Sequence, residues 1–262
     1  MAAEADTGRP LLEVEGVRKR FGGIQAVAGA SFTVGAGSVT ALIGPNGAGK
    51  TTLFDLVTGF APADSGSVRF DGEEVGRLAP HAIARRGMVR TFQLTRALAA
   101  MPVLDNMLLA APDQPGERLR NVVLRPRAVR AREREVREQA LELLEVFGLR
   151  EKADDYAGTL SGGQRKLLEL ARALMARPRM LLLDEPMAGI NPTLGRRLLD
   201  HIQRLRSEEG MTFLFVEHDM EVVMNHSDRV IVMAEGRVIA AGEPHEVRSD
   251  PAVVDAYLGS PA

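Results

Sequence analysis

The sequence predicts an α/β fold with a mostly parallel core sheet, an antiparallel β subdomain and an inserted α-helical subdomain. The first observation is that apolar runs with the length of buried strands alternate with helical segments. The expected strands cover 38–44, 179–186 and 211–219, and the expected helices cover 50–60, 162–177 and 193–208. Strands that alternate with helices form a parallel sheet through crossover connections.

The antiparallel part is expected from a second pattern. Residues 11–34 alternate loosely between apolar and polar side chains and are broken by Gly-Gly and Gly-Ala pairs, which is typical of short antiparallel strands. Hairpin turns are expected at Asp71-Gly72 and at Glu235-Gly236, because each pair separates two apolar runs.

The helical insert is expected from a third pattern, which begins near residue 93. An apolar stripe at helical spacing, with Gly148 as its C-terminal cap, consists of Val136, Ala140, Leu143, Leu144 and Phe147. We therefore expect a single domain over 11–258 after a flexible tail at 1–10. Its core covers about 11–92 and 165–258, and the insert covers about 93–164.

Composition excludes several classes of function. The chain has no cysteine, so disulfides, zinc ribbons and thiol catalysis are excluded. A net charge of −2 and few aromatic residues argue against a nucleic acid partner. The acidic N-terminus does not resemble a signal peptide, and no apolar run approaches the roughly 20 residues that span a bilayer. A role at a membrane would therefore require a membrane partner.

The segment "GPNGAGKTT" is a complete phosphate-binding loop and predicts a P-loop NTPase. It follows an expected strand and precedes an expected helix, so backbone N–H groups and the helix N-terminus can bind phosphate. Lys50 would reach the outer phosphates of ATP, and the Thr51 hydroxyl would bind Mg²⁺. The alternative to a phosphate-binding loop is a turn that contains Gly and Lys by chance. The expected nucleotide-binding residues are Gly44, Pro45, Asn46, Gly47, Ala48, Gly49, Lys50, Thr51 and Thr52.

Two more strand ends carry candidate residues. Asp184 ends the apolar run "MLLLD" and would hold Mg²⁺, and Glu185 would act as general base toward water. His218 ends "FLFVEH" and could contact a terminal phosphate or hold Glu185. The alternatives are a helix-capping Asp-Glu-Pro turn and a structural imidazole.

Gln93 and the segment "LSGGQRK" complete the candidate site. Gln93 lies where sheet and insert meet, where an amide could bind Mg²⁺, although a polar loop residue is the simpler alternative. Ser161 and Gln164 fit a capping box at a helix start. The box does not account for Gly162 and Gly163, which favour close approach of a ligand such as a γ-phosphate to the backbone. Spacing alone leaves open whether that phosphate belongs to the same chain.

Taken in order, "GPNGAGKTT", Gln93, "LSGGQ", "LLLDEP" and His218 resemble an ATP-binding cassette ATPase subunit of ABC transporters over about 11–258. The resemblance implies a head-to-tail pair with a second cassette, in which Ser161 and Gly163 serve the partner's ATP. It also implies that Phe21 stacks on adenine and that Gln93 faces membrane subunits. Asn191 departs from the family pattern, which usually has Asp there.

Further segments are similar to the ATP-binding subunits of branched-chain amino acid importers, among them "GMVRTFQLTRAL" and "VEHDMEVVMNHSDRVIVMAEG". This likeness implies two transmembrane permease subunits, an extracytoplasmic substrate-binding protein and a place on the cytoplasmic side of the membrane. Urea or amide importers, exporters and nucleic-acid-associated cassettes are the alternatives.

Residues 117–138 contain eight Arg and four Glu, a net charge of +4. The expected explanation is a solvated helix with Glu133–Arg137 and Arg134–Glu138 pairs. The alternative is contact with anionic lipid or with a membrane partner.

Overall fold

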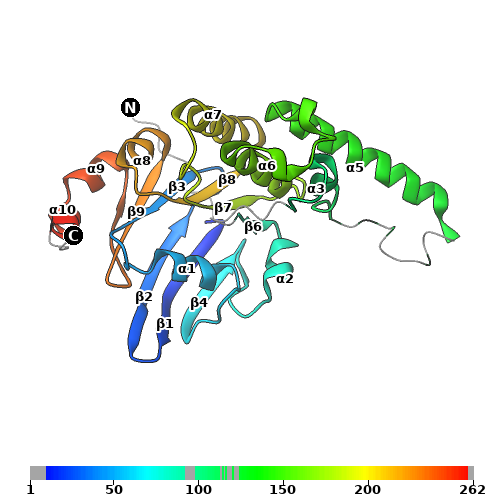
Figure 1. Cartoon of the computed structure of the whole chain (residues 1–262). Helices are drawn as coiled ribbons and strands as arrows, with labels where there is room; N and C mark the ends of the chain where they lie inside the picture. The colour runs from blue at the N-terminus through cyan, green and yellow to red at the C-terminus, as the bar shows by residue number, and fades with distance from the viewer. Residues whose placement is uncertain are drawn as a thin grey trace, which may run out of the picture. The chain divides into compact units, whose positions relative to one another are not determined.

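The computed structural model describes residues 10–91, 98–112, 114, 116, 120 and 124–258 (Figure 1). The chain divides into two compact units. The first contains residues 1–90, 178–188 and 196–262, and the second contains 91–177 and 189–195.

The core of the first unit is a mostly parallel sheet with the strand order β10-β9-β3-β8-β7-β6. Its strands are β3 (Val39–Ile43), β6 (Met88–Arg90), β7 (Met180–Asp184), β8 (Thr212–Val216), β9 (Arg229–Ala234) and β10 (Arg237–Gly242). All neighbours are parallel except β9 and β10. Every residue of β3, β7 and β8 is buried, as expected for parallel strands covered on both faces. The predicted α/β fold class is confirmed.

A second sheet of the first unit is antiparallel and has the order β2-β1-β4-β5. Its strands are β1 (Leu12–Phe21), β2 (Ile24–Val34), β4 (Ser65–Phe70) and β5 (Glu73–Glu74). Both predicted hairpin turns are present. Asp71 and Glu235 have φ values of 53° and 48°, and each is followed by a glycine at 75°. Tight hairpin turns require this left-handed backbone.

Helix α1 joins the two sheets of the first unit. Its buried Leu53, Phe54 and Leu56 belong to one apolar cluster with Val14 of β1 and Leu182 of β7, and Figure 1 shows the helix between the sheets. Helix α1 therefore packs against both sheets. The helices with residues in this unit are α1 (Lys50–Val57), α2 (Pro80–Ala84), α7 (Pro192–Glu209), α8 (Met220–His226), α9 (Pro244–Ser249) and α10 (Pro251–Leu258).

The second unit is helical and contains α3 (Val103–Leu108), α5 (Pro126–Val146) and α6 (Gly162–Leu174), with 3₁₀ turns at Arg150–Lys152 and Ala157–Thr159. The predicted stripe of α5 is buried except for Leu143, which is half-buried. Gly148 follows the helix with a φ of 66°. We expected α6 largely in the core, but it packs against α3 and α5 and belongs to this unit. None of the described helices is long and apolar enough to cross a membrane.

The prediction of two ion pairs on the Arg-rich helix is wrong. Neither Glu133–Arg137 nor Arg134–Glu138 forms among the described residues; the pair on this stretch joins Arg132 to Glu135 at 2.9 Å. Arg134 Nε instead donates to the Arg130 carbonyl at 3.4 Å, which draws its guanidinium toward the N-terminal turn.

Asn106 is the polar centre of the second unit. Its side chain is fully buried in α3, and its Oδ1 accepts from Leu98 N at 2.8 Å. Its Nδ2 donates to the carbonyl oxygens of Leu98, Met101 and Pro102. A single amide thus ties the chain segment before α3 to the first turn of that helix.

Replacing Asn106 with alanine should lower the free energy of unfolding by about 1–3 kcal/mol, because the Leu98 N–H would lose its acceptor and three carbonyl groups would each lose one of their two donors. Urea unfolding followed by circular dichroism measures this change. Asn225→Ala, on an exposed position of α8, is the matched control and should shift stability by less than about 0.5 kcal/mol. Equal effects of both substitutions would contradict the role of Asn106.

Candidate active site

The phosphate loop connects β3 to α1, and its shape depends on glycines that lie against backbone. A Cβ at Gly44 would lie 2.1 Å from the Met233 carbonyl oxygen, and a Cβ at Gly49 would lie 2.4 Å from that of Ala26. Both glycines also have positive φ. The loop is therefore formed against the ends of β9 and β2.

Lys50 begins α1 and lies across the loop. Its Nζ donates to the Gly44 and Pro45 carbonyls at 2.6 Å and 3.0 Å. Burial lowers the pKa of the Lys50 ammonium, while the carboxylates of Glu185 and Asp184 act in the opposite direction. The two carboxylates at the end of β7 therefore lie near enough to the phosphate loop to favour the charged form of Lys50.

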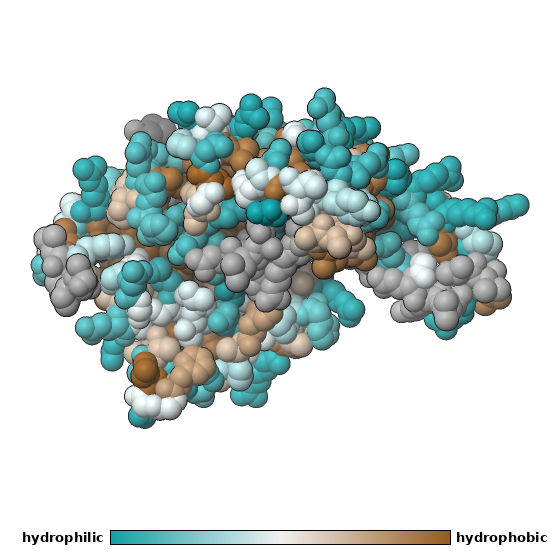
Figure 2. Space-filling model, viewed as in Figure 1, coloured by the Kyte–Doolittle hydropathy of each residue, from teal (hydrophilic) through white to brown (hydrophobic). Residues whose placement is uncertain are grey.

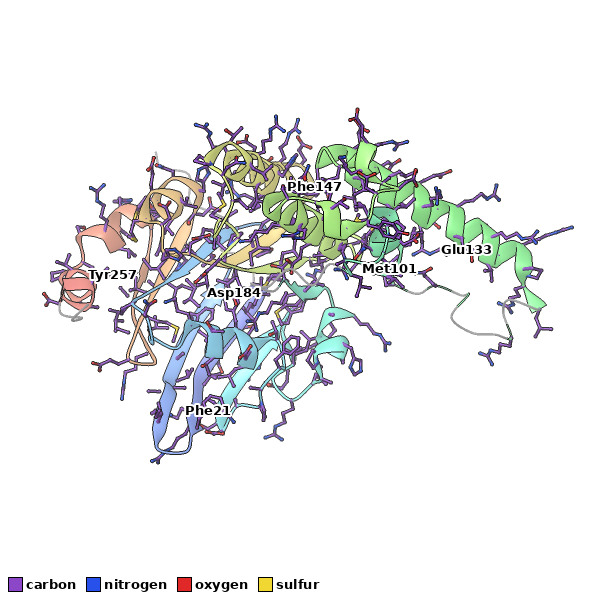
Figure 3. All side chains as sticks on the ribbon, viewed as in Figure 1. Phe21, Met101, Glu133, Phe147, Asp184 and Tyr257 are labelled. Atoms are coloured by element: carbon purple, nitrogen blue, oxygen red, sulfur yellow. The ribbon has the colours of Figure 1, made fainter. Side chains whose placement is uncertain are left out.

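Asp184 is the last residue of β7, as the sequence predicted (Figure 3), and Glu185 follows it directly. The Asp184 side chain is 6% exposed and forms an ion pair with Arg90. Glu185 has a φ of 48°, a left-handed conformation that a residue with a side chain rarely adopts, and its N–H donates to the Val216 carbonyl. Strain of this kind concentrates at functional sites.

His218 follows the neighbouring strand β8. Its Nδ1 lies 3.9 Å from Glu185 Oε1, and its side chain is 69% exposed. The imidazole can therefore approach both Glu185 and a bound ligand. Asp219 accepts hydrogen bonds from Glu221 and Val222 and caps α8, which fixes the backbone after His218.

These donors suit ATP with Mg²⁺. The lysine and the loop backbone suit phosphate, and the Thr51 hydroxyl and Asp184 carboxylate are the hard oxygen donors that Mg²⁺ prefers. Thr51 is exposed and Thr52 is half-buried. Within the described residues no group of three or more His, Cys, Asp or Glu could hold a metal.

Glu217 is a residue that the sequence analysis missed. It lies between Val216 and His218 and is only 1% exposed. Its Oε1 accepts from Met187 N at 2.8 Å and its Oε2 from His218 N at 3.3 Å. One carboxylate thus links the segment after Glu185 to the segment that carries His218. The sequence did contain one indication of this role, because Glu217 directly precedes His218 at the end of a predicted strand.

Phe21 lies at the end of β1, in the β1–β2 hairpin. It is 53% exposed and its neighbour Ile24 is 73% exposed; Figure 2 shows hydrophobic atoms at this end of the hairpin. Lys19 Nζ lies 5.4 Å from the Phe21 ring centroid. An exposed ring next to a cation is available for stacking.

Ser161 and Gln164 form the predicted capping box in the second unit. Gln164 N donates to Ser161 Oγ at 3.2 Å, and Ser161 N donates to Gln164 Oε1 at 2.9 Å. Apart from its chain neighbours and the backbone of its own helix, no described residue has an atom within 4 Å of a Cβ built at Gly162, whereas one at Gly163 would lie 2.2 Å from Leu194 Cδ2. Packing within the unit therefore accounts for one of the two glycines, and Gly162 is the one that leaves space for a ligand.

Two further predictions concern the borders of the site. Gln93 lies outside the described residues. Asn191, where the family usually has Asp, accepts from Leu194 N at 2.9 Å and so stabilises the start of α7. Asn and Asp are equally good at this position.

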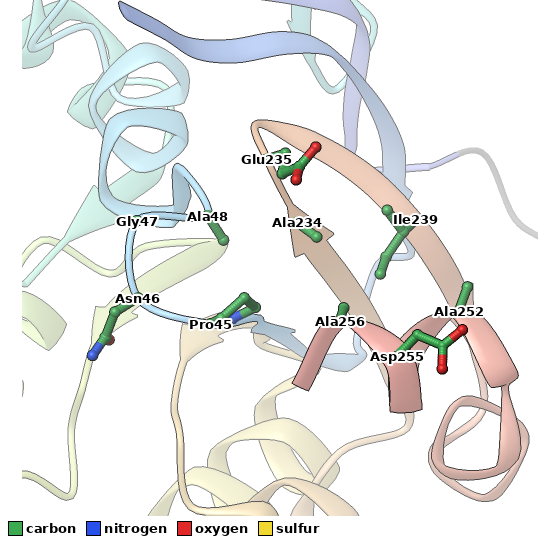
Figure 4. A pocket seen from close by; sticks show the side chains of 10 residues that line it. All are labelled: Pro45, Asn46, Gly47, Ala48, Ala234, Glu235, Ile239, Ala252, Asp255 and Ala256. Carbon is green, nitrogen blue, oxygen red and sulfur yellow. The ribbon is translucent and has the colours of Figure 1, made fainter. Parts of the chain in front are cut away.

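A hollow lies beside the phosphate loop (Figure 4). This cavity of about 440 Å³ is bounded by Pro45 to Ala48, the β9–β10 turn and α10. Burial raises the pKa of the Tyr257 hydroxyl on α10. Residues Ala252, Asp255 and Ala256 of α10 line the hollow together with the loop.

The fold and this site define a P-loop nucleotide-binding cassette. A family model described as "ABC transporter" matches residues 27–188, and one described as "Branched-chain amino acid ATP-binding cassette transporter" matches 237–262. The chain belongs to the family of ABC transporter ATP-binding cassettes, which confirms the resemblance.

Relatives match over nearly the full length. The high-affinity branched-chain amino acid transport ATP-binding protein BraF of Pseudomonas aeruginosa is 45% identical over 251 residues, covering 96% of this chain and 98% of BraF. The probable branched-chain amino acid transport ATP-binding protein LivG of Archaeoglobus fulgidus is 42% identical, with 95% and 96% covered.

Solved structures agree with the fold. The crystal structure of a nucleotide-free ATP-binding cassette from an ABC transporter has a TM-score of 0.82 and 39% identity, with 96% of this chain and 100% of that chain covered. The ADP conformation of the ABC transporter cassette MJ1267 has a TM-score of 0.81 and 37% identity, with 97% and 100% covered.

The buried carboxyl of Glu217 should make stability depend on pH. Burial raises its pKa above the ordinary 4.5, against the hydrogen bonds from Met187 and His218. The folded state then binds more protons than the unfolded state, so stability falls as pH rises from the unfolded pKa through the folded one. The unfolding free energy of the parent minus that of Glu217→Gln should decrease from about pH 4 to pH 7. Denaturant titrations measure it, and a constant difference would contradict the shift.

Proposed function

We propose that this chain is the ATP-hydrolysing subunit of a membrane importer for branched-chain amino acids. The observation that carries the ATPase part is the convergence of Lys50, Asp184 and Glu185 at the phosphate loop. The substrate class is supported by the names of the relatives and by the family match at residues 237–262.

In this proposal Lys50 and the loop backbone bind the phosphates, and Phe21 stacks on the adenine. Thr51 and Asp184 would hold Mg²⁺, which neutralises phosphate charge when it is bound. Glu185 accepts a proton from the attacking water, and His218 orients Glu185 from its 3.9 Å position. Gln93 stays a predicted Mg²⁺-linked residue.

We further propose that two cassettes act head to tail, with Ser161 to Gln164 of one chain closing over ATP held by the other. The open space at Gly162 supports this role, because the backbone N–H groups at a helix N-terminus attract anions. Two permease subunits and an extracytoplasmic substrate-binding protein would complete the importer. The chain would then lie at the cytoplasmic side of the membrane, held by the permeases.

Glu185→Gln should keep ATP binding and lower hydrolysis by about 10²-fold or more, because the amide cannot accept the proton. Phosphate release measures the rate, and size exclusion with ATP should show an accumulating dimer. Glu208→Gln, an exposed position on α7, is the control and should hydrolyse at the parent rate. Parental hydrolysis by Glu185→Gln would remove Glu185 as the base.

Complementation tests whether each ATP site uses two chains. Lys50→Ala removes the phosphate lysine, and Gly162→Glu adds negative charge in open space without a clash in its own chain. Each variant alone should be inactive, and their mixture should regain part of the parental hydrolysis, since a mixed dimer contains one intact site. If the mixture stays inactive while the parent hydrolyses ATP, each site lies within one chain.

A further inference from the structure

Arg90 is a buried charge at the edge of the site. It is the last residue of β6, where it pairs with Leu182 of β7, and its side chain is 5% exposed. Its Nη2 donates to Asp184 Oδ2 at 3.0 Å, and its Nη1 donates to Asp55 Oδ1 at 2.5 Å. The planar guanidinium therefore connects two carboxylates that lie far apart in the sequence.

The two carboxylates belong to different halves of the metal site. Asp184 ends the strand β7, and Asp55 lies on α1, the helix whose first residues are Lys50 and Thr51. Arg90 thus ties the helix that would present the metal-binding hydroxyl to the strand end that would present the metal-binding carboxylate. A change in the distance between them would disturb both ligands.

Two aromatic rings lie next to the guanidinium in addition to its two carboxylate partners. Its Cζ lies 5.5 Å from the ring centroid of Phe54 and 5.9 Å from that of Phe60. Arginine stacks on aromatic rings while its edge makes forked hydrogen bonds, which lysine cannot reproduce. The Arg90 side chain is 5% exposed, so these contacts are made away from solvent.

We propose that Arg90 is a positioning residue for the Mg²⁺ site. Arg90 orients the Asp184 carboxylate by binding its Oδ2, which leaves Oδ1 for the metal. Through Asp55 it also fixes the position of α1 relative to β7. In the described part of the chain no hydrogen bond is made to Oδ1. The charge of Arg90 is balanced by Asp55, so Asp184 keeps its attraction for a divalent ion. This inference rests on the proposed ATPase function.

Arg90→Lys tests the proposal, because it keeps the charge and removes the fork. Binding of a fluorescent ATP analogue is measured in EDTA and then with increasing free Mg²⁺. The variant should bind in EDTA as the parent does, because Lys50 and the loop are unchanged. The free Mg²⁺ needed for half of the Mg²⁺-dependent gain in affinity should rise by about tenfold or more, as for other residues that orient metal ligands.

Arg179→Lys is the matched control. Arg179 also forms an ion pair, at 2.7 Å with Asp71, and lies 5.9 Å from the ring centroid of Phe70; among the described residues, neither partner belongs to the proposed site. It should leave both affinities unchanged.

The outcomes separate three cases. The inference is overturned if folded Arg90→Lys needs the same free Mg²⁺ as the parent. It is also overturned if the variant loses the same affinity with and without Mg²⁺, and Arg90 would then only support the fold. If Arg90→Lys does not fold, Asp55→Asn is the deciding variant. This variant keeps the hydrogen bond between Arg90 and Asp184, and the free Mg²⁺ that it requires should still rise. An unchanged Mg²⁺ requirement would overturn the proposed link from Asp55 through Arg90 to Asp184. Failure of the parent itself to bind ATP in a Mg²⁺-dependent way would instead contradict the proposed function.

Discussion

The site depends on the hydrogen-bonded register of three parallel strands. Leu42 of β3 pairs with Val216 of β8, and Val216 pairs with Asp184 of β7. The chain therefore leaves all three strands at the same edge, where the phosphate loop, Glu185 and His218 follow. Because side chains alternate along a strand, a slip of one residue would turn each of these groups to the opposite face. The buried apolar side chains on both faces of the strands oppose such a slip.

Beyond the strand ends, order is maintained by single polar contacts. The left-handed conformation of Glu185 costs about 1–3 kcal/mol and persists only where the surroundings determine it. The hydrogen bond from its N–H to Val216 and the Glu217 carboxylate that receives Met187 supply this restraint. Burial of Glu217 is unfavourable by itself, so the carboxylate serves placement rather than stability. The site thus combines a rigid sheet with a few costly contacts that orient its catalytic groups.

The sequence predicted the parts of the site that depend on local patterns. The phosphate loop, the strand ends at Asp184 and His218 and the capping box at Ser161 each combine a short motif with an adjacent periodic element. Arg90 has no local pattern, because its partners lie 35 and 94 residues away and only the fold brings them together. Glu217 resembles a solvated residue at a strand end until its burial is known. The close packing of Gly163 against Leu194 comes from the fold, which spacing could not reveal.

The floor of the phosphate loop is made of backbone atoms from elsewhere in the chain. The carbonyls of Ala26 and Met233 exclude any side chain at Gly49 and Gly44, and Gly236 donates its N–H to the Ala48 carbonyl. Only main-chain atoms are used, so side chains along β2 and the β9–β10 hairpin are free to vary during evolution. The number of residues is not free, since an insertion in that hairpin would move the carbonyl beneath Gly44. Natural variation around the loop should therefore consist of substitutions, with deletions and insertions kept away from it.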